Sequence, residues 1–466
     1  MSEHSTSPTD EGRARAAIRA WRRSRRLAVL DDDPTGSQSV HHVQVVTVPD
    51  DAELEAALSP ESSVAFVLTN TRGLPEGDAV RLNTEVVGKL LALDPHLDLV
   101  SRSDSTLRGH VLAEVEEIAR LRAELGGRPF DGVILAQAFF EAGRFTADDV
   151  HYATVGGAAV PVGETEFARD ATFGYRSSNL REFVAEKSGG AIAAEDVLSI
   201  PLETIAAGPD AVRDVLLRAS GGQFVVANGT SYADYETVVL GVQAAVDAGR
   251  SFLFRTGPSF VRALAGIEPQ SPLRVGDFPE LGGGAGHGLV VVGSHVSQTS
   301  RQVAAARERR DLVEIEVSVP RIIAGDADYL AERTQAVRDA LATSDALLFT
   351  SRDLITGDNA GSSLDIARTV SSAVSAIVAG SVSARPAWVV AKGGITSHDV
   401  AVRGLGIRRA TVLGQLLPGQ ISVFDPISAP DGVVGMPYVV FAGNVGDDQT
   451  LADVIETLHS AQRVRS

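Results

Sequence analysis

Short apolar runs alternate with helical patterns along most of this 466-residue chain, and this alternation constrains its fold more than any other feature. In segments such as Asp78–Leu93 and Leu112–Leu125, apolar residues return every three or four positions, which is typical of helices. Strands that alternate with helices form mostly parallel sheets. We therefore expect an α/β fold, with strands in the first half at residues 27–30, 43–48, 64–68, 97–100, 132–136, 224–227 and 252–254.

The length of the chain and one interruption of the pattern predict two domains. A chain of 466 residues is too long for one ordinary core. Prolines and glycines interrupt the pattern over residues 268–288, which we interpret as a linker. The alternative, a phosphate loop, is disfavoured because these glycines precede the strand Leu289–Val292, whereas the dinucleotide fingerprint follows a strand. We expect a tail or helix over 1–26, a first domain over 27–267 with an inserted lobe or hairpin over 148–173, and a second domain over 289–466.

Composition excludes several classes of protein. The net charge of −18 argues against a nucleic-acid partner, which requires an excess of Lys and Arg over a broad face. No run approaches the roughly 18 uninterrupted apolar residues of a membrane span, so we expect a soluble protein. The absence of cysteine removes disulfides, thiolate zinc sites and cysteine nucleophiles, and fits a cytoplasmic location. The seven arginines of Arg13–Arg26 are interpreted as a solvated helix or a frayed tail.

An acidic turn follows the first predicted strand. Asp31, Asp32 and Asp33 precede Pro34-Thr35-Gly36, and carboxylates packed this closely resist burial unless a cation or hydrogen bonds hold them. In open α/β sheets, ligands bind beyond the carboxyl ends of the strands. The turn therefore indicates a binding or catalytic site, with a solvated Asx turn as the alternative.

Similar polar segments follow other predicted strands of the first half. They are Thr69–Gly73 with Arg72, Ser101–His110 with Asp104, Ser105 and Arg108, and Phe139–Thr146 with Arg144. Arginine forks bind carboxylates and phosphates. Two simpler interpretations stay open: Ser105 or Thr106 caps the following helix, and Arg144 pairs with Glu141 at the surface. Together these segments predict a site for a small, polyhydroxylated anion.

The second half repeats a layout of strand end, glycine and hydroxyl side chain. Gly293-Ser294 with Ser297, Lys392–Ser397 and Gly443-Asn444 all follow predicted strands. Backbone N–H groups at helix starts attract anions, so these turns predict a nucleotide-phosphate site, with helix caps as the alternative. P-loop, nucleophile-elbow and zinc-helix motifs are absent from the sequence. His41 and His42 are expected on opposite faces of a strand, so no metal site is predicted there.

The motifs taken together resemble those of the four-carbon acid sugar kinases, two-domain α/β enzymes that use ATP to phosphorylate tetronate-type acids such as threonate, erythronate or 3-oxo-tetronate. The likeness covers roughly residues 27–458 and rests on Asp32–Gly36, Ser103–Gly109, Gly293-Ser294 with Ser297, Gly393–Ser397, Leu417–Gly419 and Gly443–Gly446. Two departures stand out. Phe441-Ala442 occupy positions where members of the family often have Lys-Ser, and Arg102 stands where they often have Lys.

The resemblance implies a fold of two α/β domains, each with a mostly parallel sheet flanked by helices, and an active site in the cleft between them. The first domain would hold the sugar acid and the second would hold ATP, with Mg²⁺ carried by the nucleotide. The expected catalytic carboxylate is Asp33 or Asp32, and the Asp33→Asn variant is expected to fold and lose most turnover. The expected substrate-binding residues are Thr35, Gly36, Arg72, Asp104, Ser105, Arg108 and Arg144; the nucleotide-binding residues are Ser294, Ser297, Gly393, Gly394, Ile395, Thr396, Ser397, Gly443 and Asn444.

Two other functions stay open. One is a regulatory homologue that kept the pocket and lost catalysis, motivated by the missing lysine before Gly443. The other is a different α/β enzyme acting on hydroxy acids, such as a dehydrogenase or isomerase, although the dinucleotide fingerprint is absent. A homodimer is compatible with either.

Overall fold

The computed structural model describes residues 8–33, 36–59, 63–278, 286–294, 296–351 and 360–463. Thr35 and the three consecutive glycines of the expected linker, Gly282, Gly283 and Gly284, lie outside these ranges. The chain divides into two compact units, Met1–Val40 with Pro49–Pro269, and His41–Val48 with Gln270–Ser466. The short segment His41–Val48 thus lies in the second unit, whereas the sequence placed it within the first domain.

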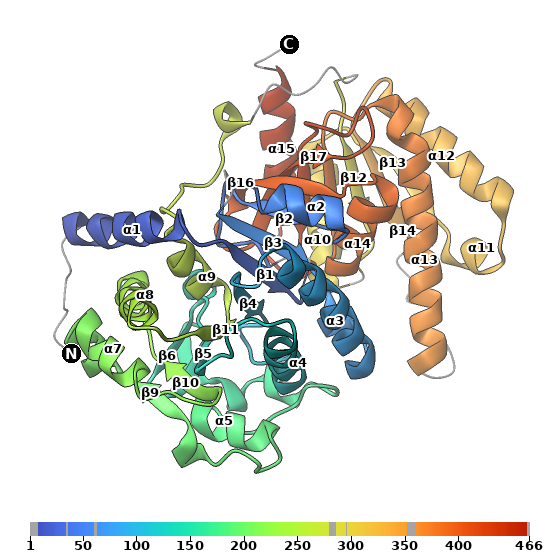
Figure 1. Cartoon of the computed structure of the whole chain (residues 1–466). Coiled ribbons are helices and arrows are strands. Elements are labelled where there is room, and N and C mark those ends of the chain that lie inside the picture. The colour runs from blue at the N-terminus through green and yellow to red at the C-terminus, as the bar shows by residue number, and fades with distance from the viewer. Residues whose placement is uncertain are drawn as a thin grey trace. The chain divides into compact units, whose positions relative to one another are not determined.

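The first unit contains a parallel sheet with the strand order β3-β1-β4-β11-β5-β10-β9 (Figure 1). Its central strands are buried along their whole length, as expected where helices cover both faces. The bounds of the strands are β1 (Leu27–Asp31), β3 (Val64–Leu68), β4 (Asp98–Arg102), β5 (Gly132–Ala136), β9 (Leu198–Ile200), β10 (Gln223–Ala227) and β11 (Phe252–Thr256).

Two groups of helices flank this sheet (Figure 1). Helices α3 (Glu76–Leu93) and α4 (Val111–Glu124) pack against each other, and α1 (Pro8–Arg22), α7 (Pro209–Leu216), α8 (Tyr232–Asp247) and α9 (Pro258–Ala265) form the second group. The shorter helices are α2 (Asp51–Ala57), α5 (Leu180–Lys187) and α6 (Leu202–Ala206). The expected hairpin is a separate antiparallel sheet of β6 (Arg144–Ala147), β7 (Val150–Val155) and β8 (Ala158–Pro161).

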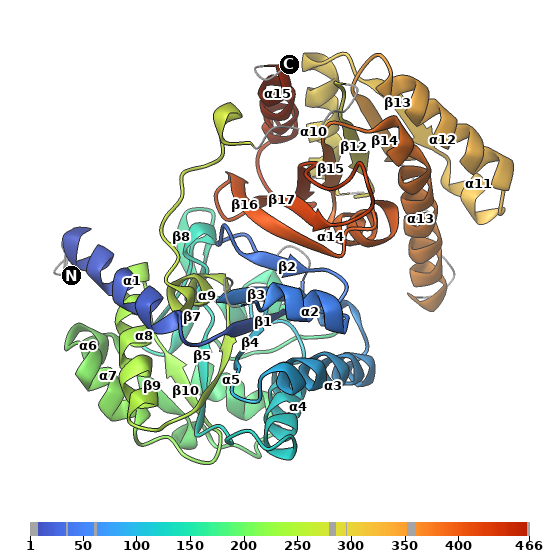
Figure 2. The same cartoon turned by 45° about the horizontal axis from the view of Figure 1, so that its top comes forward.

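The second unit contains a mixed sheet with the strand order β13-β14-β12-β15-β18-β17-β16-β2 (Figure 2). The strands from β13 to β18 in this order are parallel, and the others are antiparallel. The strand bounds are β2 (Gln44–Val46), β12 (Leu289–Val292), β13 (Val313–Val317), β14 (Ala346–Thr350), β15 (Val389–Lys392), β16 (Arg409–Leu417), β17 (Ile421–Ser428) and β18 (Tyr438–Phe441). The helices are α10 (Ser297–Arg309), α11 (Val319–Ile323), α12 (Ala327–Leu341), α13 (Ala360–Ser381), α14 (Gly394–Asp399) and α15 (Thr450–Arg463).

Strand β2 explains the assignment of His41–Val48 to the second unit. It pairs with β16 in antiparallel register, with Arg409 opposite Val46 and Thr411 opposite Gln44. Strand β16 also pairs with β17, and the two form an antiparallel hairpin. Gln420 and Gly419 lie in the turn of that hairpin, and Gly419 has the positive φ of 67° that favours glycine.

Each unit has a point where the strand order changes direction. In the first unit the chain adds β3 on one side of β1 and then β4 on the other side. In the second unit it adds β14 on one side of β12 and β15 on the other. Ligands bind outside the carboxyl ends of the strands at such switch points. The acidic turn after β1 and the glycine turns after β12 and β15 lie at these two positions.

The arginine-rich N-terminal segment is docked on the first unit, so the expectation of a solvated helix or frayed tail is wrong. Arg22 is 1% exposed; its Nη1 donates to Asp98 Oδ2 at 2.6 Å and its Nε to the carbonyl of Leu264 at 3.0 Å. Arg15 Nη1 donates to Glu236 at 2.9 Å and its Nε to Glu268 at 2.7 Å. The buried carboxylates of Asp98 and Glu236 hold this segment on the first unit, and composition alone cannot show where such partners lie.

We expect the Arg22→Met variant to lower the free energy of unfolding by about 2–3 kcal/mol, because it removes the buried one of the two arginines, Arg22 and Arg25, that hold the carboxylate of Asp98. Urea denaturation of the whole chain measures the loss. Arg23→Met is the matched control, because Arg23 is exposed. Equal midpoints for the two variants would contradict the structural role of Arg22.

The two adjacent histidines do not lie on opposite faces of a strand. Residues 41 and 42 precede β2, and His42 has a φ of 54°. Their Nδ1 atoms are 2.8 Å apart and the rings meet edge to face. The prediction failed because β2 begins only at Gln44, so that both histidines lie in the segment before the strand.

Within the described part of the chain, one segment is long and apolar enough to cross a membrane by length and composition. It is Ile366–Ala384, which belongs mostly to α13, and 33% of it is buried. Core helices of soluble proteins also meet this criterion, so it is weak evidence of a membrane span.

Candidate functional site

The carboxylates that follow β1 are buried. Asp31 and Asp32 are 0% and 2% exposed, so the alternative of a solvated turn is wrong. Asp31 Oδ1 accepts hydrogen bonds from Arg102 Nη1 at 2.9 Å and from the backbone N–H of Asp33 at 3.2 Å. Burial raises the pKa of Asp31 to about 6, although Arg102 opposes the shift. A Cβ on Gly36 would overlap the Asp31 carboxylate, so the turn requires glycine at this position.

Asp32 is the least neutralised carboxylate of this group. Neither of its carboxylate oxygens has a hydrogen-bond partner among the residues that the structure describes, and Arg102 Nη1 lies 3.9 Å from Oδ1. Burial raises the pKa of Asp32 to about 7, despite the charges of the arginines around it. A carboxylate with a pKa near neutrality can accept a proton from a hydroxyl group and release it again.

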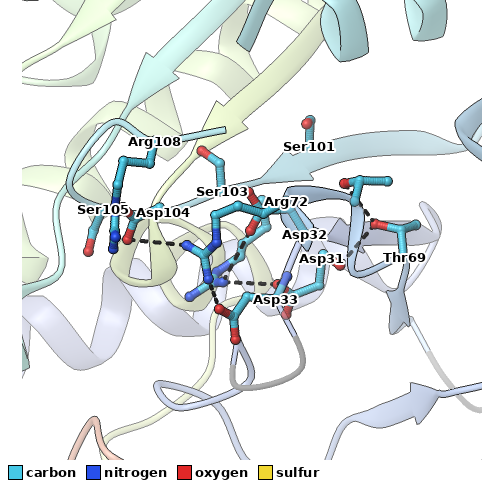
Figure 3. Close-up of polar contacts among 12 residues, drawn as sticks. Asp31, Asp32, Asp33, Thr69, Arg72, Ser101, Ser103, Asp104, Ser105 and Arg108 are labelled. Carbon is cyan, nitrogen blue, oxygen red and sulfur yellow. Dashed lines mark hydrogen bonds and ion pairs between the residues drawn. The ribbon is translucent and has the colours of Figure 1, made fainter. Parts of the chain in front are cut away.

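Arg72 lies between two other carboxylates (Figure 3). It follows β3 in the 3₁₀ turn Thr71–Gly73, forms an ion pair with Asp33, and places Nη1 3.4 Å from Asp104 Oδ1. Arg108 Nε donates to Asp104 Oδ2 at 2.7 Å. Burial alone would raise the pKa of Asp104, but Arg72 and Arg108 outweigh it and hold that pKa well below its usual range. Arg72 and Arg108 therefore already have carboxylate partners.

Arg144 is different, because no carboxylate among the described residues lies within ion-pair distance of it. Its Nη1 donates to Ser105 Oγ at 2.7 Å. The expected alternative partner, Glu141, instead pairs with Arg262 at 3.2 Å. The ring of Phe167 lies near both guanidinium groups, with its centroid 5.3 Å from that of Arg108 and 5.4 Å from that of Arg144. Arg144 can therefore accept the carboxylate of a ligand.

The three-stranded hairpin positions the loop that follows β4. Nε2 of His151 on β7 lies 2.7 Å from the carbonyl oxygen of Ser105, and its Nδ1 lies 2.9 Å from Thr146 Oγ1. Tyr175 donates its hydroxyl hydrogen to the carbonyl of Thr106 at 2.7 Å. Burial lowers the pKa of His151 to about 4, so the ring is neutral at physiological pH. Helix α4 has no side-chain cap, so Ser105 and Thr106 are not the caps that the alternative required.

In the second unit, the turns after β12, β15 and β18 converge. A Cβ on Gly293 would overlap Thr396 Oγ1, and one on Gly443 would lie 2.9 Å from Ser294 Oγ. Gly393 has a φ of 118°, and its Cβ would lie 3.4 Å from Ser294 Cβ. Glycine is therefore required where these turns approach one another.

Most of the predicted nucleotide-binding residues lie at this edge of the sheet. Neither α10 nor α14 has a side-chain cap, so the cap alternative is wrong for the turns after β12 and β15. Ser297, Ile395 and Asn444 are exposed, and a Cβ on Gly394 would meet open space. Ser397 differs, because it is buried and its hydroxyl donates to the carbonyl of Ala391 at 2.8 Å. This hydrogen bond joins α14 to β15, so the Ser397 hydroxyl has a structural partner within the protein.

The comparisons with known proteins identify both units. Residues 27–264, more than half of the chain, match the family of sugar-binding N-terminal domains, and residues 289–451 match nucleotide-binding C-terminal domains. The chain belongs to the four-carbon acid sugar kinase family. Comparison with curated proteins gave no match.

Solved structures support the fold of this family member. A Haemophilus influenzae protein from a domain family without an assigned function has a TM-score of 0.65 at 15% identity, over 94% of this chain and all of that one. A Salmonella typhimurium protein described as a putative tRNA synthase has a TM-score of 0.70 at 16% identity, over 95% of this chain and 99% of that one. At these identities the likeness concerns the fold alone.

Two buried charges beside the acidic turn of this kinase-family protein were not predicted from the sequence. Arg255 on β11 is fully buried, donates from Nη1 to Ser101 Oγ at 2.6 Å and forms an ion pair with Glu114 on α4. Gly109 separates Arg255 from Asp32: its Cβ would lie 3.2 Å from Arg255 Nη2 and 3.0 Å from Asp32 Oδ2. The available signal was an arginine directly after the apolar run Phe252–Phe254, at a position where a buried charge requires a partner.

Within the ranges that the structure describes, no group of three or more His, Asp or Glu side chains could hold a metal ion. The residues therefore do not form a dedicated Mg²⁺ site of their own. A Mg²⁺ ion that is bound mainly by nucleotide phosphates needs only one or two protein carboxylates. The expectation of Mg²⁺ stays a prediction, and no step proposed below depends on it.

Proposed function

We propose that this protein is an ATP-dependent kinase that phosphorylates a hydroxyl group of a small sugar acid, with four-carbon acids as the expected substrates. The observation that carries the proposal is the pairing of two unsatisfied groups on the first unit. Within the described part of the chain, the carboxylate oxygens of Asp32 have no hydrogen-bond partner and Arg144 has no carboxylate partner. A hydroxy acid supplies a hydroxyl group for the first and a carboxylate for the second.

In the proposed reaction, Asp32 accepts the proton of the substrate hydroxyl. The hydroxyl oxygen then forms a bond to the γ-phosphorus of ATP while the bond from that phosphorus to the bridging oxygen of ADP breaks. The products are the phosphorylated acid and ADP, and the proton leaves Asp32 for solvent. Phosphoryl transfer depends on positioning and charge stabilisation more than on covalent chemistry. Arg72, held by Asp33 and Asp104, is a cation of fixed position near the reacting oxygen.

The second unit supports the nucleotide part of the proposal. The uncapped start of α10 leaves backbone N–H groups for an anion, and the hydroxyl groups of Ser294 and Thr396 border the same turns. The match to nucleotide-binding C-terminal domains agrees with this role.

The test is ADP formation by the whole chain with MgATP and a panel of three-, four- and five-carbon sugar acids, with the matching neutral sugars as controls. The proposal predicts acid-dependent ADP formation and a phosphorylated product detected by mass spectrometry. Thermal stabilisation by both ligands without turnover on any acid would favour the regulatory alternative. Equal turnover of acids and neutral sugars would contradict the role of Arg144.

We expect the Arg144→Gln variant to raise the KM for the acid about 100-fold with a smaller change in kcat, because a charge-assisted hydrogen bond to the substrate carboxylate is lost. Steady-state kinetics with the preferred acid measures the split. Arg169→Gln is the matched control, since Arg169 lies on the same lobe but is exposed. Arg108→Ala is expected to act less strongly, because Arg108 is already paired with Asp104.

A further inference from the structure

Lys392 is a buried lysine at the convergence of the three glycine turns. It is the last residue of β15, lies opposite Phe441 of β18 in the sheet, and is 0% exposed. Its Nζ lies 3.7 Å from the centroid of the Phe441 ring and donates to the carbonyl oxygens of Ala442 at 3.1 Å and Gly443 at 3.4 Å. The ammonium group thus lies directly under the Gly443 turn, where the sequence of β18 itself supplies no cation.

The same turn carries other groups suited to an anion. Thr299 Oγ1 donates to the carbonyl of Gly443 at 3.0 Å and lies within hydrogen-bond distance, 3.2 Å, of Ser294 Oγ. The carbonyl groups of Ala442 and Gly443 both accept hydrogen bonds from Lys392, and that of Gly443 also accepts one from Thr299. Both carbonyl groups are therefore directed toward the buried lysine. These carbonyl oxygens therefore do not face a ligand that binds at the exposed residue Asn444.

Charged side chains on the surrounding elements are engaged elsewhere. On α10, Arg301 pairs with Asp448 at 2.8 Å. Arg309 pairs with Asp453 of α15 at 2.6 Å and with Glu456. Asp447 Oδ1 accepts hydrogen bonds from the backbone N–H of Gln449 and from the hydroxyl of Thr450. On α14, Asp399 lies 3.6 Å from Arg403, and His398 is partly buried. The strand β12 contains no titratable residue. No carboxylate within the described ranges forms an ion pair with Lys392.

We propose that Lys392 is a positioning residue for the nucleotide: no carboxylate of the described residues balances a charge on it, and a nucleotide phosphate bound at the Gly443 turn supplies that balance. Binding of the phosphate then brings a proton onto Lys392. This inference rests on the proposed nucleotide site and adds to it the residue that couples phosphate binding to proton uptake.

The protonation state of Lys392 agrees with this assignment. Burial lowers the pKa of Lys392 to about 7, and no charged neighbour offsets the effect. A phosphate bound nearby raises the pKa again, because an opposite charge favours the ammonium form. At pH 8 only about a tenth of Lys392 is protonated in the free protein, so binding takes up close to one proton.

The experiment is calorimetric titration of the whole chain with MgADP at pH 8, in two buffers that differ in ionisation enthalpy. At this pH the terminal phosphate of ADP is already ionised, so proton uptake is attributable to the protein. The wild type should take up close to one proton per ADP, and its affinity should fall about fivefold between pH 7 and pH 8. Lys392→Met should bind ADP weakly with no uptake. Lys392→Arg should retain binding with no uptake, because arginine is always charged.

Each outcome decides one proposal. ADP binding by the wild type without proton uptake would overturn the role of Lys392 and leave the nucleotide site intact, and this result needs no variant. Proton uptake retained by Lys392→Arg would assign the proton to another group and also overturn it. Absence of both binding heat and thermal stabilisation by MgADP would contradict the nucleotide site itself.

Discussion

The Asp32→Asn variant should fold normally and lose about 10³-fold in kcat with the preferred acid, because the amide cannot accept the proton of the substrate hydroxyl. Asparagine has nearly the same size as aspartate, and the carboxyl group of Asp32 is already half neutral near pH 7. The substitution therefore removes the proton acceptor with little cost to packing. Steady-state kinetics and thermal denaturation measure the two effects separately.

Asp33→Asn is the matched control for this prediction. Asp33 forms an ion pair with Arg72, and both side chains are about one-fifth exposed. Losing such a pair costs on the order of 1 kcal/mol, or about tenfold at most. The sequence pointed to Asp33 or Asp32 as the catalytic carboxylate and predicted that Asp33→Asn loses most turnover; the environments of the two residues now favour Asp32. A larger loss in Asp33→Asn than in Asp32→Asn would reverse the assignment.

The pH dependence of the wild type supplies an independent check of Asp32. Its pKa is raised to about 7 by burial, and only the ionised form accepts a proton. The value of kcat/KM for the acid should therefore rise as the pH increases toward 7 and level off above it. Asp33→Asn should keep this profile, since it leaves the burial of Asp32 unchanged. A wild-type profile without an inflection between pH 6 and pH 8 would argue against Asp32 as the base.

The Gly394→Val variant should abolish thermal stabilisation by MgATP. A Cβ at Gly394 meets nothing within 4 Å, so the fold accommodates a side chain, but that side chain occupies the space in front of the turn. A ligand present at 100 times its Kd stabilises the folded state by about 2.7 kcal/mol, which is the contribution that should vanish. Differential scanning fluorimetry with and without MgATP measures it.

Two controls separate loss of the nucleotide site from general damage. Stabilisation by the sugar acid should survive in Gly394→Val, because the acid binds to residues of the first unit. Gly394→Ala should give an intermediate effect, as a methyl group fills less of the space. Full stabilisation of Gly394→Val by MgATP would exclude this turn from the phosphate site.

The fold was largely predictable, because buried parallel strands are continuous apolar runs. The strands at 64–68, 132–136 and 289–292 were predicted with the bounds that the structure has. Failures occurred where long-range pairing overrides the local pattern. Nothing within Gln44–Val46 indicates that it pairs with β16, more than 360 positions later. The strand β9 was missed because three residues are too few for a period to appear.

The candidate site was predictable as a set of turns but not as a set of roles. Arg72, Arg108 and Arg144 were expected close together because each follows a predicted strand. Only the structure shows that Arg72 and Arg108 have carboxylate partners, whereas Arg144 has none among the described residues. Burial likewise distinguishes Asp32 from Asp33. Arg255 and Glu114 could not be found by motif, because each lies within a regular element and acts through a partner from another element.

The assignment of β2 has a consequence for cutting the protein into parts. The backbone leaves the first unit after Val40, returns at Pro49 and leaves again after Pro269, so three covalent crossings join the two units. A fragment ending at residue 267 would carry β2 without β16, and a fragment starting at residue 289 would expose the edge of β16 that β2 covers. Proteolysis at the glycine-rich segment should therefore nick the chain without releasing two separate domains, and expression of either half alone should give aggregation-prone material.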